Sequence, residues 1–213
     1  MGKFFFHLGK KLHATKSKLK LCFIKGAFLS FGKNTDIDSD VVFEHPDKII
    51  IEDGVSICKG VVIDASSDDE CGVHLGKNSR IREGTKIHSY GGSIHIGENV
   101  RIGPNCVIYG QGGIKIGRNS GIAGLSFIVA SNHTFDENDR SKPFRLQPES
   151  NKGITIGENV WGGSNILILD GVTIGNDVTI GAGSVIRKNI PDGAVVIGNP
   201  GQICYVRKPK EDE

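Results

Sequence analysis

The chain has 213 residues, enough for one domain of moderate size, and its formal net charge at pH 7 is only +2. This near balance gives no overall sign of a nucleic-acid-binding protein. Glycine is frequent, at 30 residues, but lacks the period that marks collagen. The cysteines are odd in number and lack CxxC spacing, which indicates neither a disulfide framework nor a zinc site and favours a reducing cytoplasm. They are Cys22, Cys58, Cys71, Cys106 and Cys204.

Residues 1–33 form a basic amphipathic segment with eight lysines, no acid, and phenylalanine and leucine residues between the lysines. The lysines interrupt the segment too often for a transmembrane helix, and no small-residue cleavage site indicates a signal peptide. Two interpretations remain open. The segment can be an amphipathic helix that caps the end of the domain behind it. It can also contact an anionic membrane surface, which would make a cytoplasmic protein peripheral to the inner membrane.

From residue 34 to 206 the sequence repeats with a period of six. Each hexad has an apolar residue, a small or acidic residue, any residue, Asn or Gly, then Val, Ser or Thr, and any residue. In the first part of the chain one such hexad begins every 20 to 24 residues, at Ile51, Leu75, Ile96 and Ile116. Further on, four hexads keep a single register and begin at Ile156, Ile168, Ile174 and Ile180.

A period of six fits neither a helix nor an alternating strand, and it predicts a solenoid in which each hexad forms one wall. Three walls make a coil of about eighteen residues, so the longer upstream steps leave room for small loops. We expect the first residue of each hexad in the core and the fifth against the next wall. Gly or Asn in the second and fourth places suits corners with positive φ. A β-sandwich is disfavoured because its strands would alternate with period two. The repeat alone does not fix the handedness of the coil.

The one large interruption separates Ile116 from Ile156 by 40 residues, which is one coil plus a loop at 131–153. A loop of that length in a compact domain is usually functional. His133 stands near its start, and imidazole can take a proton near neutral pH. A lone histidine is more often a polar surface residue, but its position beside the break favours catalysis. The loop also holds four acids and two arginines: Asp136, Glu137, Asp139, Glu149, Arg140 and Arg145.

Three stretches, 131–136, 154–161 and 180–191, resemble the bacterial hexapeptide-repeat acyltransferases, and among them the sugar and polysaccharide O-acetyltransferases. The closing Gly198-Asn-Pro200-Gly is similar to the end of these enzymes, and the resemblance covers roughly residues 35 to 206. It implies an all-β, left-handed parallel β-helix. It also implies a homotrimer with active sites between neighbouring subunits, and acetyl-CoA as co-substrate without a metal. The domains expected are then the segment 1–33, the β-helix 34–206 with its loop, and a charged tail 207–213.

The resemblance also implies roles for single residues. His133 would be the general base that deprotonates a sugar hydroxyl for direct attack on the thioester. Asn105 would hold that hydroxyl, and either Asp136 or Glu149 would orient the histidine. Trp161 would line the cleft for acyl-CoA and acceptor. The cofactor contacts implied are Trp161, Gly163, Ser164, Ala182, Arg187, Lys188, Pro200 and Arg207.

One departure from the resemblance lies beside Trp161, where Gly162 replaces the isoleucine that is usual in these enzymes. We expect the missing inward side chain to open a small void or admit a ligand. Two other functions agree less well with the sequence. A β-helix carbonic anhydrase needs three histidines on zinc, but the spacing of the candidates does not follow the coil. These candidates are His74, His88, His95 and His133. A silent scaffold is disfavoured by the intact set of site residues. The saccharide acceptor, whether polysaccharide, oligosaccharide or lipid-linked sugar, is not readable from the chain.

Overall fold

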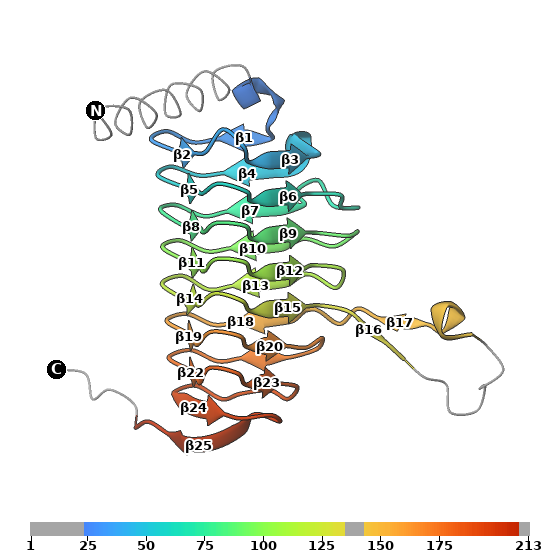
Figure 1. The fold of residues 1–213 in the computed structure, drawn as a ribbon, viewed down its shortest axis with the longest axis vertical. Coiled ribbons are helices and arrows are strands. Elements are labelled where there is room, and N and C mark those ends of the chain that lie inside the picture. The colour runs from blue at the N-terminus through green and yellow to red at the C-terminus, as the bar shows by residue number, and fades with distance from the viewer. Residues whose placement is uncertain (1–23, 135–142, 209–213) are drawn as a thin grey trace, which may run out of the picture.

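The computed structural model describes residues 24–134 and 143–208, which form a parallel β-solenoid (Figure 1). In this part of the chain three sheets of seven, nine and seven strands make up the walls A, B and C of a prism. Wall A contains β1 (Ser30–Phe31), β4 (Ile49–Ile51), β7 (Val73–Leu75), β10 (Ile94–Ile96), β13 (Ile114–Ile116), β18 (Ile154–Ile156) and β21 (Thr173–Ile174). The predicted all-β parallel solenoid is therefore confirmed.

Walls B and C complete each coil, because the chain runs from A to B to C before it returns to A. Wall B contains β2 (Asp36–Ile37), β5 (Ser56–Ile57), β8 (Arg80–Ile81), β11 (Arg101–Ile102), β14 (Gly121–Ile122), β19 (Trp161–Gly162), β22 (Thr179–Ile180), β24 (Ala194–Ile197) and β25 (Gln202–Val206). Wall C contains β3 (Val42–Glu44), β6 (Val62–Asp64), β9 (Lys86–His88), β12 (Val107–Tyr109), β15 (Phe127–Val129), β20 (Leu167–Ile168) and β23 (Val185–Ile186). Only β25 joins its wall antiparallel, beside β24.

The pairing register of wall A follows the hexads predicted from the sequence. Ile51 pairs with Leu75, and the column continues through the first residue of each later hexad. The remaining members are Ile96, Ile116, Ile156 and Ile174. All of these side chains are buried, so the first hexad place fills the core as expected. Burying one such side chain contributes about 1.5–3 kcal/mol, which makes these columns the main source of stability.

The fifth hexad place is also buried, as predicted, at Val160, Val172, Val178 and Ser184. The fourth place is the corner with positive φ, for example 55° at Asn159 and 80° at Gly171. The expectation for the second place was wrong, because Gly157 does not have positive φ. A Cβ on Gly157 would lie 2.6 Å from the carbonyl oxygen of Gly175 in the next coil. Glycine is needed there because two backbones approach closely.

The outward faces of the three walls differ in chemistry. Wall C presents one nearly apolar column, and its members are Val42, Val62, Lys86, Val107, Phe127, Leu167 and Val185. Wall A instead presents His74, His95, Lys115, Thr155 and Thr173 in the corresponding column. An apolar wall that one chain leaves half-exposed is a typical contact surface for another copy.

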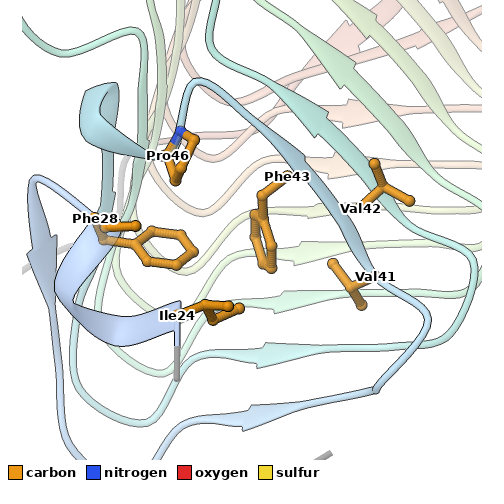
Figure 2. Close-up of a pocket in the computed structure, with 7 residues that line it drawn as sticks. Ile24, Phe28, Val41, Val42, Phe43 and Pro46 are labelled. Atoms are coloured by element: carbon orange, nitrogen blue, oxygen red, sulfur yellow. The ribbon is translucent and has the colours of Figure 1, made fainter. Parts of the chain in front are cut away.

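The N-terminal end of the solenoid carries a cluster of aromatic side chains. The 3₁₀ turn η1 (Lys25–Ala27) leads to Phe28, which packs edge-to-face on Phe31 and Phe43 with ring centroids 5.1 and 5.0 Å away. Beside them lies an apolar hollow of about 300 Å³ (Figure 2), lined by Ile24, Ala27, Phe28, Val41, Val42, Phe43 and Pro46. The next turn, η2 (Pro46–Lys48), closes this end. Residues 24–33 therefore cover the first coil, while residues 1–23 lie outside the described part of the chain. Among the residues described, no helix is long and apolar enough to span a bilayer.

Candidate active site

The long interruption forms an arm that leaves the solenoid between β15 and β18 (Figure 1). In the arm, β16 (Asn132–His133) pairs antiparallel with β17 (Glu149–Ser150), and the 3₁₀ turn η3 (Phe144–Leu146) precedes β17. The N–H and hydroxyl of Thr134 both donate to the carbonyl oxygen of Pro148, at 2.9 Å each. The histidine therefore sits on a hydrogen-bonded ribbon and not on a structureless loop.

His133 faces Glu149 across this ribbon. The two are register partners, and His133 Nε2 lies 3.7 Å from Glu149 Oε1. That distance is too long for a hydrogen bond but close enough for a carboxylate to stabilise a protonated imidazole. Both side chains are partly exposed, at 39% and 50%. The other candidate carboxylate, Asp136, lies outside the described residues.

Asp170 fixes the root of the arm, a role that we did not predict from the sequence. Its carboxylate accepts the backbone N–H groups of Lys152 and Gly153, both at 2.9 Å, and the hydroxyl of Ser150 at 2.9 Å. Three hydrogen bonds to one ionised carboxylate hold the two segments firmly together. The signal was present in the sequence, since Asp170 fills the freely variable third place of its hexad beside the only long loop.

Trp161 lies on the outward face of wall B and is 56% exposed. Its ring lies over Gly121, where an added Cβ would be 3.1 Å from two ring carbons. Gly121 therefore provides the space that the indole occupies. Below it in the wall stands Thr179, whose hydroxyl accepts a hydrogen bond from the Arg207 guanidinium. Trp161 and Thr179 are thus neighbours in one outward column of wall B, and Arg207 is bound to that column through Thr179.

Asn105 occupies the corner between walls B and C, with a φ of 54°. The same corner in the next two coils holds Leu125 and Asn165, and Leu125 is 63% exposed. A leucine with positive φ is unusual, because its Cβ meets the backbone in that conformation. Leu125 was missed in the sequence, where it appears as an ordinary apolar residue.

The small residues implied in cofactor binding follow on the same corner. Ser164 and Ala182 are exposed there in successive coils, and the N–H of Gly183 donates to the Ser164 carbonyl at 2.9 Å. A Cβ on Gly163 would lie 2.6 Å from the backbone nitrogen of Ala182. The expected void at Gly162 was wrong: the inward space is filled by Ile166 and Ile122, whose Cδ1 atoms would be 2.6 and 3.0 Å from an added Cβ.

The C-terminal turn 198–201, which contains Pro200, is bound to the last coil. Val185 donates to the Gly198 carbonyl at 3.0 Å, and Gly201 donates to the Val185 carbonyl at 2.8 Å. The N–H of Gly198 also donates to the Ser184 hydroxyl at 3.0 Å. Arg187 and Lys188 are exposed just after β23, at the other end of wall C.

One chain therefore divides the predicted site residues between two corners. His133, Glu149, Arg187 and Lys188 lie where the chain leaves wall C. The residues on wall B or at the corner between walls B and C are Asn105, Trp161, Gly163, Ser164, Ala182 and Arg207. Wall C separates the two groups by about 16 Å, the length of five extended residues. The described part of a single chain does not bring them together.

The other candidate histidines have separate surroundings. His74 Nε2 lies 2.8 Å from Glu52 Oε1 on wall A, and His95 lies beside it in the same wall. His88 is on wall C, with Nδ1 3.6 Å from Asp64. Among the residues described, no group of three or more potential ligands is arranged to hold a metal ion. These histidines do not converge with His133.

Comparisons with known proteins identify the class of this solenoid as a transferase built of hexapeptide repeats. The family model described as "Bacterial transferase hexapeptide (six repeats)" matches residues 153–188, and "Hexapeptide repeat of succinyl-transferase" matches residues 93–124. The putative colanic acid biosynthesis acetyltransferase WcaF of Escherichia coli is 31% identical over 140 residues, 66% of this chain and 72% of that protein. The galactoside O-acetyltransferase of Escherichia coli is 36% identical over 130 residues, 61% of each chain.

The chain therefore belongs to the bacterial hexapeptide-repeat acetyltransferases, and its solenoid is the left-handed parallel β-helix of that family. It spans about half to three-fifths of the length of several relatives that it matches. The solved structure of AntD, an N-acyltransferase from Bacillus cereus in complex with dTDP and 3-hydroxybutyryl-CoA, has a TM-score of 0.61. It is 21% identical, and the match covers 89% of this chain and 88% of that one. At this identity the likeness concerns the fold alone.

Proposed function

We propose that this protein is an acetyl-CoA-dependent O-acetyltransferase that acts on a hydroxyl of a saccharide. The observation that carries the proposal is His133 on a braced ribbon opposite Glu149, in a chain of the hexapeptide-repeat acetyltransferases. The names of its relatives support a sugar acceptor, such as a surface polysaccharide, an oligosaccharide or a lipid-linked sugar. Neither a carbonic anhydrase nor a scaffold has comparable support.

In the proposed reaction His133 removes the proton from the acceptor hydroxyl, and the oxygen attacks the thioester carbonyl carbon. The tetrahedral adduct then loses the CoA thiolate as the carbon–sulfur bond breaks, and the thiolate takes the proton from the imidazolium. Glu149, at 3.7 Å, lowers the energy of the imidazolium while it carries that proton. Asn105 holds the acceptor hydroxyl. Asp136 remains the alternative partner of the histidine.

The complete site requires a second copy of the chain, and we propose a homotrimer. The support is the apolar outward column of wall C together with the separation of the site residues between its two ends. If wall C packs towards a three-fold axis, the arm of one subunit approaches wall B of the next. His133 of one copy then faces Asn105 and Trp161 of its neighbour.

The direct test of this function is an assay of acetyl-CoA consumption with mono- and oligosaccharides, followed by mass spectrometry of the products. We expect one class of saccharide to gain 42 mass units per acetyl group, roughly the mass of C2H2O, with free CoA released in equal amount. Release of CoA by water alone, with no acetylated saccharide from any class, would contradict the proposal.

Lys188 and Arg187 of one copy are proposed to bind a phosphate of CoA, and Arg207 is proposed to add positive charge from wall B of the neighbouring copy. The backbone groups of Gly163, Ser164, Ala182 and Pro200 flank the pantetheine chain. Lys188→Glu should therefore raise the KM for acetyl-CoA by about tenfold and leave the KM for the saccharide nearly unchanged. Steady-state kinetics with each substrate varied in turn measures both. Equal changes in the two constants would mean that Lys188 does not contact the cofactor.

Two roles are proposed for the basic segment 1–33: it caps the solenoid, or it holds a cytoplasmic protein at the surface of an anionic membrane. Each lysine near such a surface contributes about 1 kcal/mol before screening by salt. If the segment binds a membrane, the full chain should co-sediment with anionic vesicles at low salt, and a chain that starts at residue 34 should not. If the segment only caps the solenoid, the truncated chain melts at lower temperature and neither chain binds vesicles.

A further inference from the structure

A second hollow, separate from the apolar one in Figure 2, opens on wall A at the root of the arm. Its volume is about 340 Å³, and it extends from β13 across β18 to β21. The side chains at its surface are polar or basic, namely Ser93, Lys115, Lys152, Thr155 and Thr173. No acid lines it. Its composition is therefore suited to an anion rather than to an apolar chain.

The two lysines give this hollow its charge. Lys115 and Lys152 are both exposed, and within 24–134 and 143–208 neither forms an ion pair. Asp170, at the arm root, accepts the backbone N–H groups of Lys152 and Gly153 and is not among the residues that line the hollow. Next to Lys115 in the wall stands His95, whose pKa is lowered by burial first, and then by His74 and Lys115. His95 thus adds little positive charge of its own, and the ammonium groups of the two lysines provide most of the charge of the hollow.

Glycines shape the rest of the hollow. Gly153 has a φ of +86°, and a Cβ there would lie 2.5 Å from the Gly112 carbonyl oxygen. A Cβ on Gly171 would lie 3.2 Å from Cδ of Lys152, so the lysine stem rests on the glycine. The side chain of Lys152 is therefore supported along its length. Bulkier residues at these positions would fill the floor of the hollow or displace the lysine.

We propose that this hollow is a phosphate-binding subsite for a substrate of the transferase. The inference rests on the proposed function, because the hollow adjoins the arm that carries His133. Lys152 follows Glu149 by three residues, which puts the hollow about 10 Å from the His133–Glu149 pair. Two ammonium groups and two threonine hydroxyls match the oxygen-rich surface of a phosphate or diphosphate. The phosphate can belong to a glycosyl phosphate or diphosphate acceptor, or to CoA.

Calorimetric titration with inorganic pyrophosphate tests the subsite without any turnover, so its failure is distinct from failure of the proposed function. The variant Lys115→Gln/Lys152→Gln should bind pyrophosphate at least about tenfold more weakly than the native protein. The matched control is Lys59→Gln/Lys77→Gln, which removes two exposed lysines elsewhere and should bind normally. Melting curves check that all three proteins are folded. Absence of saturable binding to the native protein, or an equal loss in the control, would overturn the proposal.

Inhibition kinetics then identify which substrate carries the phosphate. We expect pyrophosphate to compete with a phosphorylated acceptor and not with acetyl-CoA, because the hollow lies at the root of the arm that carries His133, about 10 Å from the His133–Glu149 pair. Competition with acetyl-CoA alone would assign the same subsite to the coenzyme. Inhibition that is competitive with neither substrate would contradict a subsite for either one.

Discussion

Replacement of His133 by alanine is expected to lower kcat by about 10²–10⁴-fold, the usual cost of removing a general base. Binding of acetyl-CoA should remain near normal, because the residues proposed to contact CoA are not the proposed general base. Single-turnover kinetics and calorimetric binding of CoA measure the two effects separately. The arm itself should persist, since its ribbon is held by Thr134 and by Asp170 at the root.

The matched control for this variant is His74→Ala, which removes a histidine that also faces a carboxylate but lies on wall A. Its activity should stay within a few-fold of the native protein. Full activity in His133→Ala would refute the catalytic assignment. Comparison of Glu149→Gln with Asp136→Asn under the same conditions distinguishes which carboxylate supports the histidine.

A negative charge introduced on the outward face of wall C should dissociate the proposed trimer into monomers and abolish acetyl transfer. Leu167 and Val107 point outward from β20 and β12, so aspartate at either position leaves the core of the single chain intact. In the proposed trimer the same carboxylate would be buried without a partner, at a cost of several kcal/mol. We expect Leu167→Asp to sediment as a monomer and to lose at least about 100-fold in activity, because each site loses half of its residues.

Ser56→Asp is the control, because Ser56 points outward from β5 on wall B, away from the proposed interface. It should remain trimeric and active. Sedimentation velocity and the transfer assay, carried out on the same samples, provide both readouts. A fully active monomer would rule out a site shared between subunits.

Most of the fold could be predicted because each coil buries apolar side chains at the same places of the hexad. The inward column from Ile51 to Ile174 was visible as a spacing in the sequence, and the register of wall A follows it. The second-place glycines were misinterpreted because a period does not distinguish a need for positive φ from a close approach of two backbones. Gly157 belongs to the second kind, since its constraint comes from the next coil. Gly162 was misinterpreted for a different reason: a missing inward side chain leaves a void only if its neighbours do not fill the space, and Ile166 and Ile122 fill it.

The candidate site could be predicted only in part, since its residues depend on long-range placement. His133 was found because it stands beside the break in the repeat. Its position opposite Glu149 depends on an antiparallel ribbon that the hexads do not encode. Asp170 is separated from the arm root by 17 residues, and only the coil geometry brings the two together. Leu125 occupies the fourth place of the hexad that begins at Ile122, where Asn or Gly is usual, so the register marked this position and the departure was overlooked.

The central claim is that one active site is built from two copies of the chain. It is tested most directly by mixing two inactive variants, His133→Ala and Asn105→Gly; glycine suits position 105 because its φ is positive. After unfolding and joint refolding, random trimers should contain intact pairs at about a quarter of their sites. The account predicts recovery of about that fraction of the native activity, in proportion to the amount of mixed trimer. No recovery, in samples where mixed trimers are present, would contradict a site shared between subunits.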